Sequence, residues 1–132
     1  MRFIDTNIFI YVATDHPLYG GTSKAILERV ESGEEAATST LVLCEVAWVL
    51  EAMGRQSDIK ETLEKILSYP SMEIAVFESD DLIVGSNLMA SHRVDFNDAV
   101  NLAIMERLGI DEIYSNDEKH IGKLGFIKTV FQ

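Results

Sequence analysis

The sequence predicts an α/β fold built around a mostly parallel sheet. Short apolar segments alternate along the whole chain with segments whose apolar residues recur at helical spacing. The helical segments are also long enough to serve as crossovers between parallel strands, which an α/β fold requires. We therefore expect helices on the faces of a central sheet, with right-handed connections between the strands.

The composition fits one domain over residues 1–132. Hydrophobic residues make up 47% of the 132 residues, which is enough for one core and too much for a disordered chain. The longest apolar run, over 8–13, is too short to span a membrane, and Asp5 interrupts the start before a signal-peptide core could form. The single Cys44 excludes an internal disulfide, and its apolar neighbours predict a small buried hydrophobe. We expect a cytoplasmic protein without a membrane segment.

The first elements are a strand, a helix and a second helix. An apolar strand is predicted over 1–4, and Asp5 or Thr6 then caps a helix over 8–12. A loop containing proline and two glycines follows. A Thr-Ser pair next caps a helix over 24–30, which a Ser-Gly pair ends.

The middle of the chain predicts one strand and two helices. The strand lies over 35–38, and a helix over 39–52 begins at Ser39 or Thr40. The Asp-Ile-Lys-Glu sequence that opens the segment 58–69 resembles a capping box, so we predict a helix that ends before the following proline.

The last third continues the alternation. Alternating apolar residues predict a strand over 72–77, followed by a helix over 79–89 and a break over 91–94. Asp95 caps a long helix over 95–108, which a glycine closes. Two short strands complete the predicted elements: 112–114 and 128–131.

Two acidic residues directly follow predicted strands. Asp5 comes after the first strand, and Asp117 comes after the strand that ends near Ser115. Ligands of open parallel sheets bind outside the carboxyl ends of the strands, so the sheet should bring both acids to one edge. Taken singly, each acid also fits an ordinary helix cap or turn. Their expected pairing favours a functional site.

Glu45 is the single carboxylate in an apolar helical segment over 41–50. A helix that is apolar on every face is buried or covered by a partner. An unpaired carboxylate in such a place is costly, so Glu45 needs a metal ion, a basic side chain or an open cleft. The alternative to a ligand role is an ion pair with a base such as Arg55 or Arg93.

A third acidic group opens the predicted helix over 95–108. Asp95, Asp98 and Asn101 are spaced so that they share one helix face. Asp95 is best explained as the N-cap. Asp98 and Asn101 lie inside the helix, where capping no longer explains them, and the helix dipole stabilises a negative charge at Asp98. We therefore expect a functional role for Asp98.

The ligand chemistry of these acids predicts a hard metal ion. Several carboxylates without cysteines or suitably spaced histidines favour Mg²⁺ or Mn²⁺ over Zn²⁺ or Cu²⁺. Such ions lower the pKa of a bound water and stabilise a leaving oxygen in phosphoryl transfer to water. A metal-assisted nuclease is the resulting hypothesis.

The order of the acidic motifs resembles that of PIN-domain ribonucleases. Four motifs carry the resemblance: Asp5 in Phe-Ile-Asp-Thr-Asn, Glu45 after a Ser-Thr pair, Asp98 in Asp-Phe-Asn-Asp-Ala, and Asp117 in Ser-Asn-Asp. The resemblance spans the whole chain, and its length and motif order are similar to VapC-type toxins of toxin–antitoxin pairs. It implies a three-layer α/β/α fold with a five-stranded, mostly parallel sheet. It also implies a Mg²⁺- or Mn²⁺-dependent endoribonuclease that cuts RNA, is commonly a homodimer and is neutralised by a VapB-like antitoxin.

The resemblance also implies residue roles. By position, Asp5, Glu45, Asp98 and Asp117 match the metal-binding acids that carry catalysis. The polar residues expected to support them are Thr6, Asn7, Ser115 and, on the face of Asp98, Asn101. The fourth motif departs from the family pattern, because Asn116 and His120 stand where apolar or aromatic residues are usual.

The charged residues of the chain form no clear basic stripe that would indicate where RNA binds. The formal net charge of −11 repels phosphate backbones, so RNA binding needs bound metal or clustered basic side chains. Arg93, Lys119 and Lys123 are candidates for phosphate contacts, and solvated surface charge is the alternative. The three histidines lack metal-ligand spacing and are expected on the surface or in loops.

Two other functions and one assembly stay open. A phosphoacceptor receiver domain has similar length and acidity, but it is expected to have an acidic pair after the first strand, where Asp5 stands alone. A catalytically inactive PIN-like binding module would keep the acids for structure or for a partner. Finally, the helices near 8–13 and 41–53 carry more apolar surface than one sheet face covers, which predicts a homodimer or a bound partner.

Overall fold

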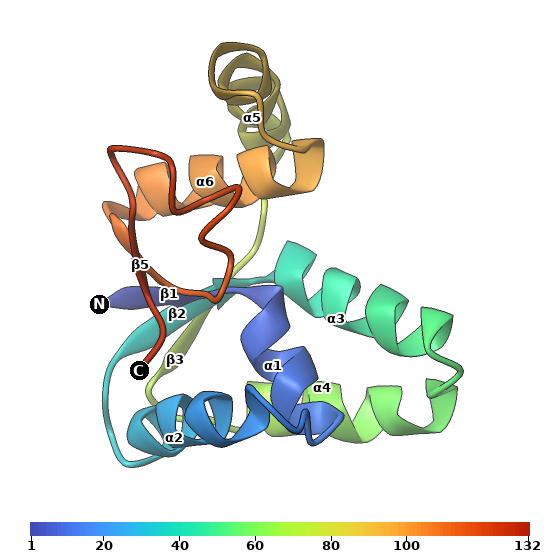
Figure 1. The fold of residues 1–132 in the computed structure, drawn as a ribbon. Coiled ribbons are helices and arrows are strands. Elements are labelled where there is room, and N and C mark those ends of the chain that lie inside the picture. The colour runs from blue at the N-terminus through green and yellow to red at the C-terminus, as the bar shows by residue number, and fades with distance from the viewer.

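The fold has three layers, with helices on both faces of one parallel sheet (Figure 1). The computed structural model describes residues 1–132. Five strands pair in the order β3-β2-β1-β4-β5, and every pair is parallel. The predicted α/β/α class with a central five-stranded sheet is therefore confirmed. The strand bounds are β1 Arg2–Ile4, β2 Ala36–Ser39, β3 Met72–Ala75, β4 Glu112–Tyr114 and β5 Lys128–Val130.

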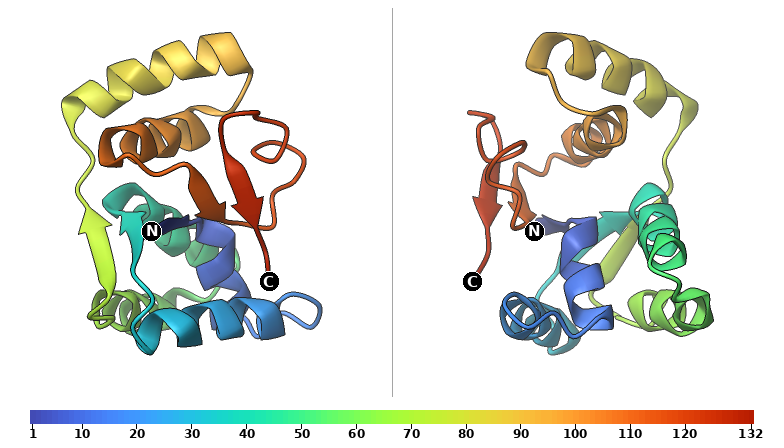
Figure 2. Two further views of the ribbon diagram at one scale, coloured as in Figure 1. Left: turned by 90° about the vertical axis from the view of Figure 1, so that its left-hand side faces the viewer. Right: turned by 45° about the vertical axis from the view of Figure 1, so that its right-hand side comes forward.

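The helices divide between the two faces of the sheet. In Figures 1 and 2, α1, α2 and α4 lie on one side, and α6 lies on the other with α5 beyond it. The α3 helix leaves the sheet directly after β2 and packs on α1 and α4. No helix is both long and apolar enough to cross a membrane. The helix bounds are α1 Thr6–Ala13, α2 Gly20–Glu31, α3 Thr40–Ala52, α4 Ile59–Leu67, α5 Ser79–His92 and α6 Phe96–Leu108.

The central strand β1 is buried because helices cover both of its faces. Phe3 and Ile4 point to opposite faces of the sheet, and both are fully buried. They belong to one hydrophobic core that also contains Ile8 of α1, Val42 of α3 and Ile104 of α6. The core thus holds the first turns of α1 and α3 and the middle of α6 against the sheet.

The strand order creates a topological switch point between β1 and β4. From β1 the chain continues to β2 and β3 on one side, and β4 then pairs with β1 on its other side. The backbone N–H of Asp5 donates to the carbonyl of Tyr114 at 3.0 Å, which sets the ends of the two strands side by side. Open α/β sheets bind ligands in the crevice at such a point.

The start of α2 corrects one prediction. The helix begins at Gly20 rather than near Lys24, and the predicted Thr-Ser cap lies inside it. Nδ1 of His16 instead accepts the backbone N–H groups of Leu18 and Tyr19 at 3.2 and 3.1 Å in the turn before the helix. A Cβ on Gly20 would lie 3.3 Å from the carbonyl oxygen of Tyr11, so the glycine permits close packing on α1. Tertiary contacts, rather than a local cap, decide where α2 begins.

The predicted capping box at Asp58 is also wrong. Asp58 makes no capping bond, and its carboxylate accepts from Nε of Arg55 at 2.7 Å, with a short 3₁₀ turn over Gln56–Asp58 before α4. A capping box forms instead between Glu78 and Asp81 at the start of α5. The nearby arginine is a stronger, charged donor than the backbone N–H groups, and it takes the Asp58 side chain away from them.

The structure differs from the sequence predictions in three smaller ways: the end of α5, the cap of α6 and the exposure of Cys44. The α5 helix runs through His92 into the predicted break, and ends at Arg93 in the left-handed region with φ 55. Asp95 occupies the N-cap position of α6 as predicted, but its side chain makes no capping bond. Cys44 is exposed on α3 rather than buried, because the buried face of that helix is made by other residues.

A glycine brings α5 and α6 unusually close together. A Cβ on Gly85 would lie 2.9 Å from Cγ2 of Val100 and 3.1 Å from its backbone nitrogen, so a side chain at this position would push the helices apart. Arg107 of α6 also donates to Asp81 of α5 through Nε at 3.1 Å. Since α5 packs mainly on α6, these two contacts hold the outer helix in place.

Candidate active site

The four acids predicted as site residues come from four elements that meet at the carboxyl edge of the sheet. Asp5 follows β1 and is the N-cap of α1, and Asp117 lies in the loop after β4. Glu45 lies on α3, and Asp98 lies in the first turn of α6. Each is partly buried. The elements that carry them are far apart in the sequence, so the site exists only in the folded chain.

Ser115 links Asp5 to Asp117. Its hydroxyl donates to Oδ2 of Asp5 at 2.7 Å and accepts the backbone N–H of Asp117 at 3.0 Å. Nδ2 of Asn7 donates to the same hydroxyl at 3.4 Å, and the backbone N–H of Thr6 donates to Oδ1 of Asp5 at 2.8 Å. The structure therefore brings both strand-end acids to one edge, with the polar neighbours that the sequence pointed to.

Asn101 connects α6 to Glu45. Its Nδ2 donates to Oε1 of Glu45 at 2.8 Å, and its Oδ1 accepts from the Ser39 hydroxyl at 2.7 Å. Glu45 makes no ion pair, and Arg55 pairs with Asp58 instead, so the ion-pair alternative for Glu45 is wrong. Ser39 was missed as a supporting residue because its N-cap role, seen in its bond from the backbone N–H of Val42 at 3.0 Å, already explained it.

The pKa values of three of the acids are raised, because the acids are partly buried and lie near one another. Burial, and then the negative charges of Asp5, Glu45, Asp117 and Asp95, raise the pKa of Asp98 from 3.8 to about 7. Burial likewise raises the pKa of Asp5, against the hydrogen bond from Ser115, and the charge of Asp117 adds to the rise. Burial also raises the pKa of Glu45, against the Asn101 bond. The carboxylates repel one another, and a bound cation would relieve this repulsion.

His120 is a neighbour of the site that sequence reasoning did not include. It is exposed, as expected, but its Nδ1 lies 3.1 Å from Oδ1 of Asp117, and its backbone N–H donates to the same oxygen at 2.9 Å. The spacing of three residues between the two side chains was the available signal. The contact orients the Asp117 carboxylate from the solvent side.

The donor atoms of the site fit a divalent ion that keeps part of its water shell. All the candidate ligands are oxygens, and two more oxygens beside Asp5, Oγ1 of Thr6 and Oδ1 of Asn7, are buried without a hydrogen-bond partner. No three His, Cys, Asp or Glu side chains converge closely enough to enclose an ion by themselves. Mg²⁺ is commonly held by one or two carboxylates with water completing its coordination, so the open arrangement suits such an ion.

The raised pKa values predict how the stability of the metal-free protein depends on pH. The stabilisation tied to protonated Asp98 is fully present below its ordinary pKa of 3.8 and is lost as the pH rises through about 7. Asp5 and Glu45 shift in the same direction. With a chelator present, we expect the thermal unfolding midpoint to fall between pH 5 and pH 8, and Mn²⁺ to restore it at pH 8. A midpoint that stays level or rises over this range would contradict the electrostatic description.

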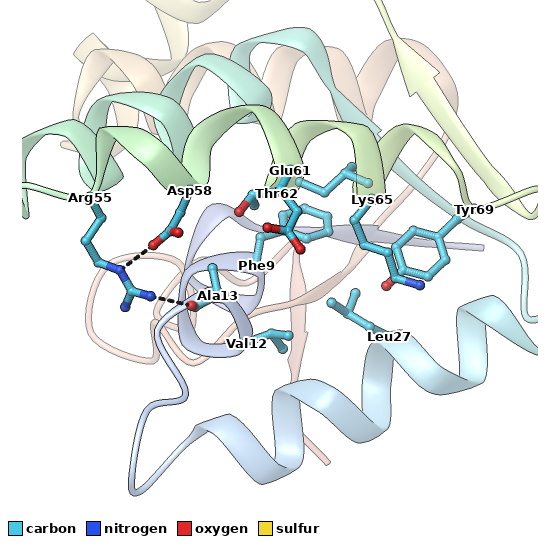
Figure 3. Close-up of a pocket in the computed structure, with 11 residues that line it drawn as sticks. Phe9, Val12, Ala13, Leu27, Arg55, Asp58, Glu61, Thr62, Lys65 and Tyr69 are labelled. Carbon is cyan, nitrogen blue, oxygen red and sulfur yellow. Dashed lines mark hydrogen bonds and ion pairs between the residues drawn. The ribbon is translucent and has the colours of Figure 1, made fainter.

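A separate apolar pocket of about 250 Å³ lies between α1, α2 and α4 (Figure 3). Its walls include Phe9, Val12 and Leu27, and none of the four acids lines it. Arg55 stands at one end, where it also donates to the carbonyl of Ala13 at 3.2 Å, and Lys65 stands toward the other. The pocket thus has an apolar wall, a basic side chain toward each end, and the polar Glu61 and Thr62 near its middle.

Comparisons with known proteins identify similar sequences and folds. The sequence model of the PIN domain matches residues 2–126. No curated protein sequence matches the chain. Among solved structures, Mycobacterium tuberculosis VapC20, described as a sarcin-ricin loop cleaving toxin, is similar with a TM-score of 0.82 and 20% identity, covering 97% of this chain and 98% of that one.

Two toxin–antitoxin complexes are also similar in structure. VapBC2 of Rickettsia felis, bound to a DNA fragment from its promoter, has a TM-score of 0.74 and 18% identity, over 98% of this chain and 96% of that one. A toxin–antitoxin complex of Klebsiella pneumoniae has a TM-score of 0.70 and 18% identity, with the same shares covered. At these identities the likeness shows a shared fold.

Proposed function

Because the chain belongs to the PIN domain family, we propose that it is a Mg²⁺- or Mn²⁺-dependent endoribonuclease and the toxin of a toxin–antitoxin pair. The observation that carries the proposal is the set of Asp5, Glu45, Asp98 and Asp117 at the switch point, three of which have raised pKa values. Titratable groups gathered against their mutual repulsion at such a place are typical of functional sites. The similar solved toxins support the toxin role.

The four acids would hold the ion, some directly and the others through its remaining water molecules, and the other polar residues would keep the acids in place. When bound, the ion lowers the pKa of a water molecule and offsets negative charge on the phosphate. Ser115 and the backbone N–H of Thr6 fix the two oxygens of Asp5. Asn101 fixes one oxygen of Glu45 and leaves the other available. Without the ion, Asp98 holds a proton part of the time at neutral pH, which reduces the repulsion among the acids.

The proposal is tested by incubating the protein with a circular RNA of mixed sequence. We expect Mn²⁺ or Mg²⁺ to support opening of the circle and a chelator to stop it, because only an endonuclease can cut RNA without ends. Cleavage that persists in the chelator would contradict metal dependence. Calorimetric binding of Mn²⁺ without cleavage of any RNA would favour the catalytically inactive alternative.

The receiver-domain alternative has lost its support. The match to the PIN domain covers nearly the whole chain. Asp5 also stands alone after β1, and β3 leads into a loop and the capping box of α5 rather than into an acid at the switch point. We therefore keep only the inactive PIN-like module beside the nuclease.

We place the antitoxin on the pocket between α1, α2 and α4. Its apolar wall and charged ends suit a helical or extended segment that carries apolar anchors with a charge at each end. The pocket does not contain the acids. An antitoxin segment bound there therefore leaves the acids free for a further part of the antitoxin. Slower amide hydrogen exchange in α1 and α4 after addition of a cognate antitoxin would support this position, and unchanged exchange there would contradict it.

A homodimer is the second assembly that we propose. Apolar side chains are exposed on α3, where Trp48 is 53% accessible, at its C-cap Met53, which is 51% accessible, and on α5, where Ile83 is 66% accessible. Clusters of exposed apolar side chains on a small protein mark interaction surfaces. Sedimentation velocity at micromolar concentration should show a dimer, and a monomer would contradict the proposal.

A further inference from the structure

Seven of the 11 basic side chains of this acidic protein make ion pairs with acids of the same chain. The exceptions make neither an ion pair nor a side-chain hydrogen bond: Lys24, Arg93, Lys119 and Lys123. These four basic side chains are therefore free to bind an anion from outside the chain.

Three of these four unpaired residues lie in the two segments that carry Asp98 and Asp117. Arg93 is at the junction of α5 and α6, just before the turn of α6 that holds Asp98. Lys119 and Lys123 are in the loop between β4 and β5 that also holds Asp117. All three are exposed. Most of the unpaired positive charge therefore lies in the two segments that carry Asp98 and Asp117.

The two segments are neighbours in space. The ring of His92, next to Arg93, lies 4.9 Å from the ring of Phe126 at the far end of the loop. Phe126 also lines one pocket together with Leu102 and Glu106 of α6. These contacts place the junction that holds Arg93 beside the loop that holds both lysines.

The backbone at Arg93 indicates that its side chain matters. Arg93 ends α5 in the left-handed region with φ 55, a conformation that favours glycine or asparagine at the end of a helix. An arginine there is strained, and its guanidinium finds no partner in the chain to compensate. Backbone strain next to a functional site is typical of residues whose side chain has a function, which we infer for Arg93.

We propose that Arg93, Lys119 and Lys123 form a phosphate-binding rim that holds the RNA backbone on either side of the acids. This inference rests on the proposed function and adds the residues that contact the substrate. The carboxylates repel phosphate, so basic groups beside them are needed to bring the backbone near. Contacts of this kind position the strand and carry little sequence information.

The test measures how RNA binding depends on salt. Binding of a labelled single-stranded RNA is followed by fluorescence anisotropy in the Asp98→Asn background, where the strand should stay intact. Each phosphate contact to single-stranded nucleic acid contributes about 0.7 to the slope of log K against log salt concentration. Replacing all three rim residues by glutamine should lower the slope by about 2 and weaken binding more than about 10-fold at low salt.

A charge-matched control separates local contacts from net charge. The variant Lys24→Gln, Lys60→Gln, Lys128→Gln makes the same change in net charge at exposed positions outside both segments. It should leave the slope close to that of the parent. Equal losses in the two triple variants would overturn the proposal, since general charge would then explain both. Weaker antitoxin binding with unchanged RNA binding in the rim variant would also overturn it.

The single change Arg93→Gly separates binding from folding. Glycine relieves the left-handed strain, so the unfolding midpoint should rise while RNA affinity falls. A purely structural role for Arg93 predicts no loss of affinity in this variant. If the protein binds RNA through the rim and never cuts it, the proposed nuclease function is wrong and the phosphate-binding rim is supported. If it cuts RNA but the rim variants bind and cut like the parent, the rim alone fails.

Discussion

Replacing Asp98 by asparagine is expected to lower metal-dependent RNA cleavage by at least about 100-fold, a loss comparable to that of one preorganised electrostatic contact in other enzymes. Asparagine keeps the shape of the side chain and removes its negative charge. The site then loses affinity for the cation, because the charge that offsets the ion is reduced. The measurement is kcat/KM for cleavage, together with calorimetric binding of Mn²⁺.

The same substitution should make the metal-free protein more stable at pH 8. Asp98 is ionised at that pH against the charges of Asp5, Glu45 and Asp117, and asparagine removes this repulsion. Urea unfolding in the presence of a chelator should show a higher midpoint for the variant at pH 8 and little difference at pH 5, where Asp98 is mostly protonated. A variant that loses activity and gains stability shows that the charged site lowers the stability of the fold.

Asp95→Asn is the matched control for this experiment. Asp95 carries the same group one turn earlier, is exposed, and makes no capping bond. Its replacement should change the free energy of unfolding by no more than about 0.5 kcal/mol and leave cleavage close to that of the parent. If Asp98→Asn cut RNA as well as the parent with the fold intact, the assignment of Asp98 to the metal site would be wrong.

Replacing Asp81 by asparagine should be the most destabilising change to a polar side chain in this protein. Asp81 is 4% exposed, and its Oδ2 accepts from Arg107 at 2.9 Å and from the backbone N–H of Glu78 at 2.8 Å. Asparagine must turn an NH₂ group toward one of these donors. Because Arg107 is partly exposed, we expect a loss of roughly 2–3 kcal/mol, below the range for fully buried pairs.

The pH dependence of this loss distinguishes the ion pair from packing. The hydrogen bond from Arg107, followed by the bond from the backbone of Glu78, lowers the pKa of Asp81 below 3.8. The stabilisation is therefore present above that pH and disappears as the pH falls through the lowered pKa, so the difference between parent and variant should shrink in acid. Urea unfolding at pH 7 and pH 3 measures it. A difference that is independent of pH would show that lost packing, not lost charge, is responsible.

Asp80→Asn provides the comparison on the same helix turn. Asp80 is exposed and makes no ion pair, so its replacement removes only a favourable interaction with the helix dipole, worth at most about 1 kcal/mol. Losses of equal size at the two positions would contradict the special role of the Asp81–Arg107 pair. Near-parent RNA affinity in both variants at low temperature would show that the site survives when α5 is loosened.

Local signals made much of the fold and the site predictable. The end of β1 at Asp5 and the end of α6 at Gly109 follow from residues within one turn of each boundary. Because parallel strands end at one edge, Asp5 and Asp117 could be placed together before any contact was known. Asn101 could be assigned to the face of Asp98 from helix geometry, although its partner Glu45 could not.

The failures have one kind of cause. The start of α2 depends on His16 and on close packing of Gly20 against α1, and the false capping box at Asp58 depends on Arg55. At Asp58, the side chain that could have capped the helix binds an arginine instead. At α2, the predicted Thr-Ser cap is not used, because contacts with α1 set the start of the helix. The contact of His120 with Asp117 depends in the same way on the path of a loop.

The amino-acid sequence alone determined the alternation of strands and helices, the parallel sheet and the identity of the four acids, because these depend on periodicity, on caps and on the polarity of single positions. The tertiary structure alone decided which acids share a repulsive environment, which hydrogen bonds hold them, and which basic side chains stay unpaired. These properties depend on distances between residues such as Asp81 and Arg107 or Ser39 and Asn101, which lie far apart in the chain. Coulomb and hydrogen-bond energies change steeply with such distances, and only the packed core sets them.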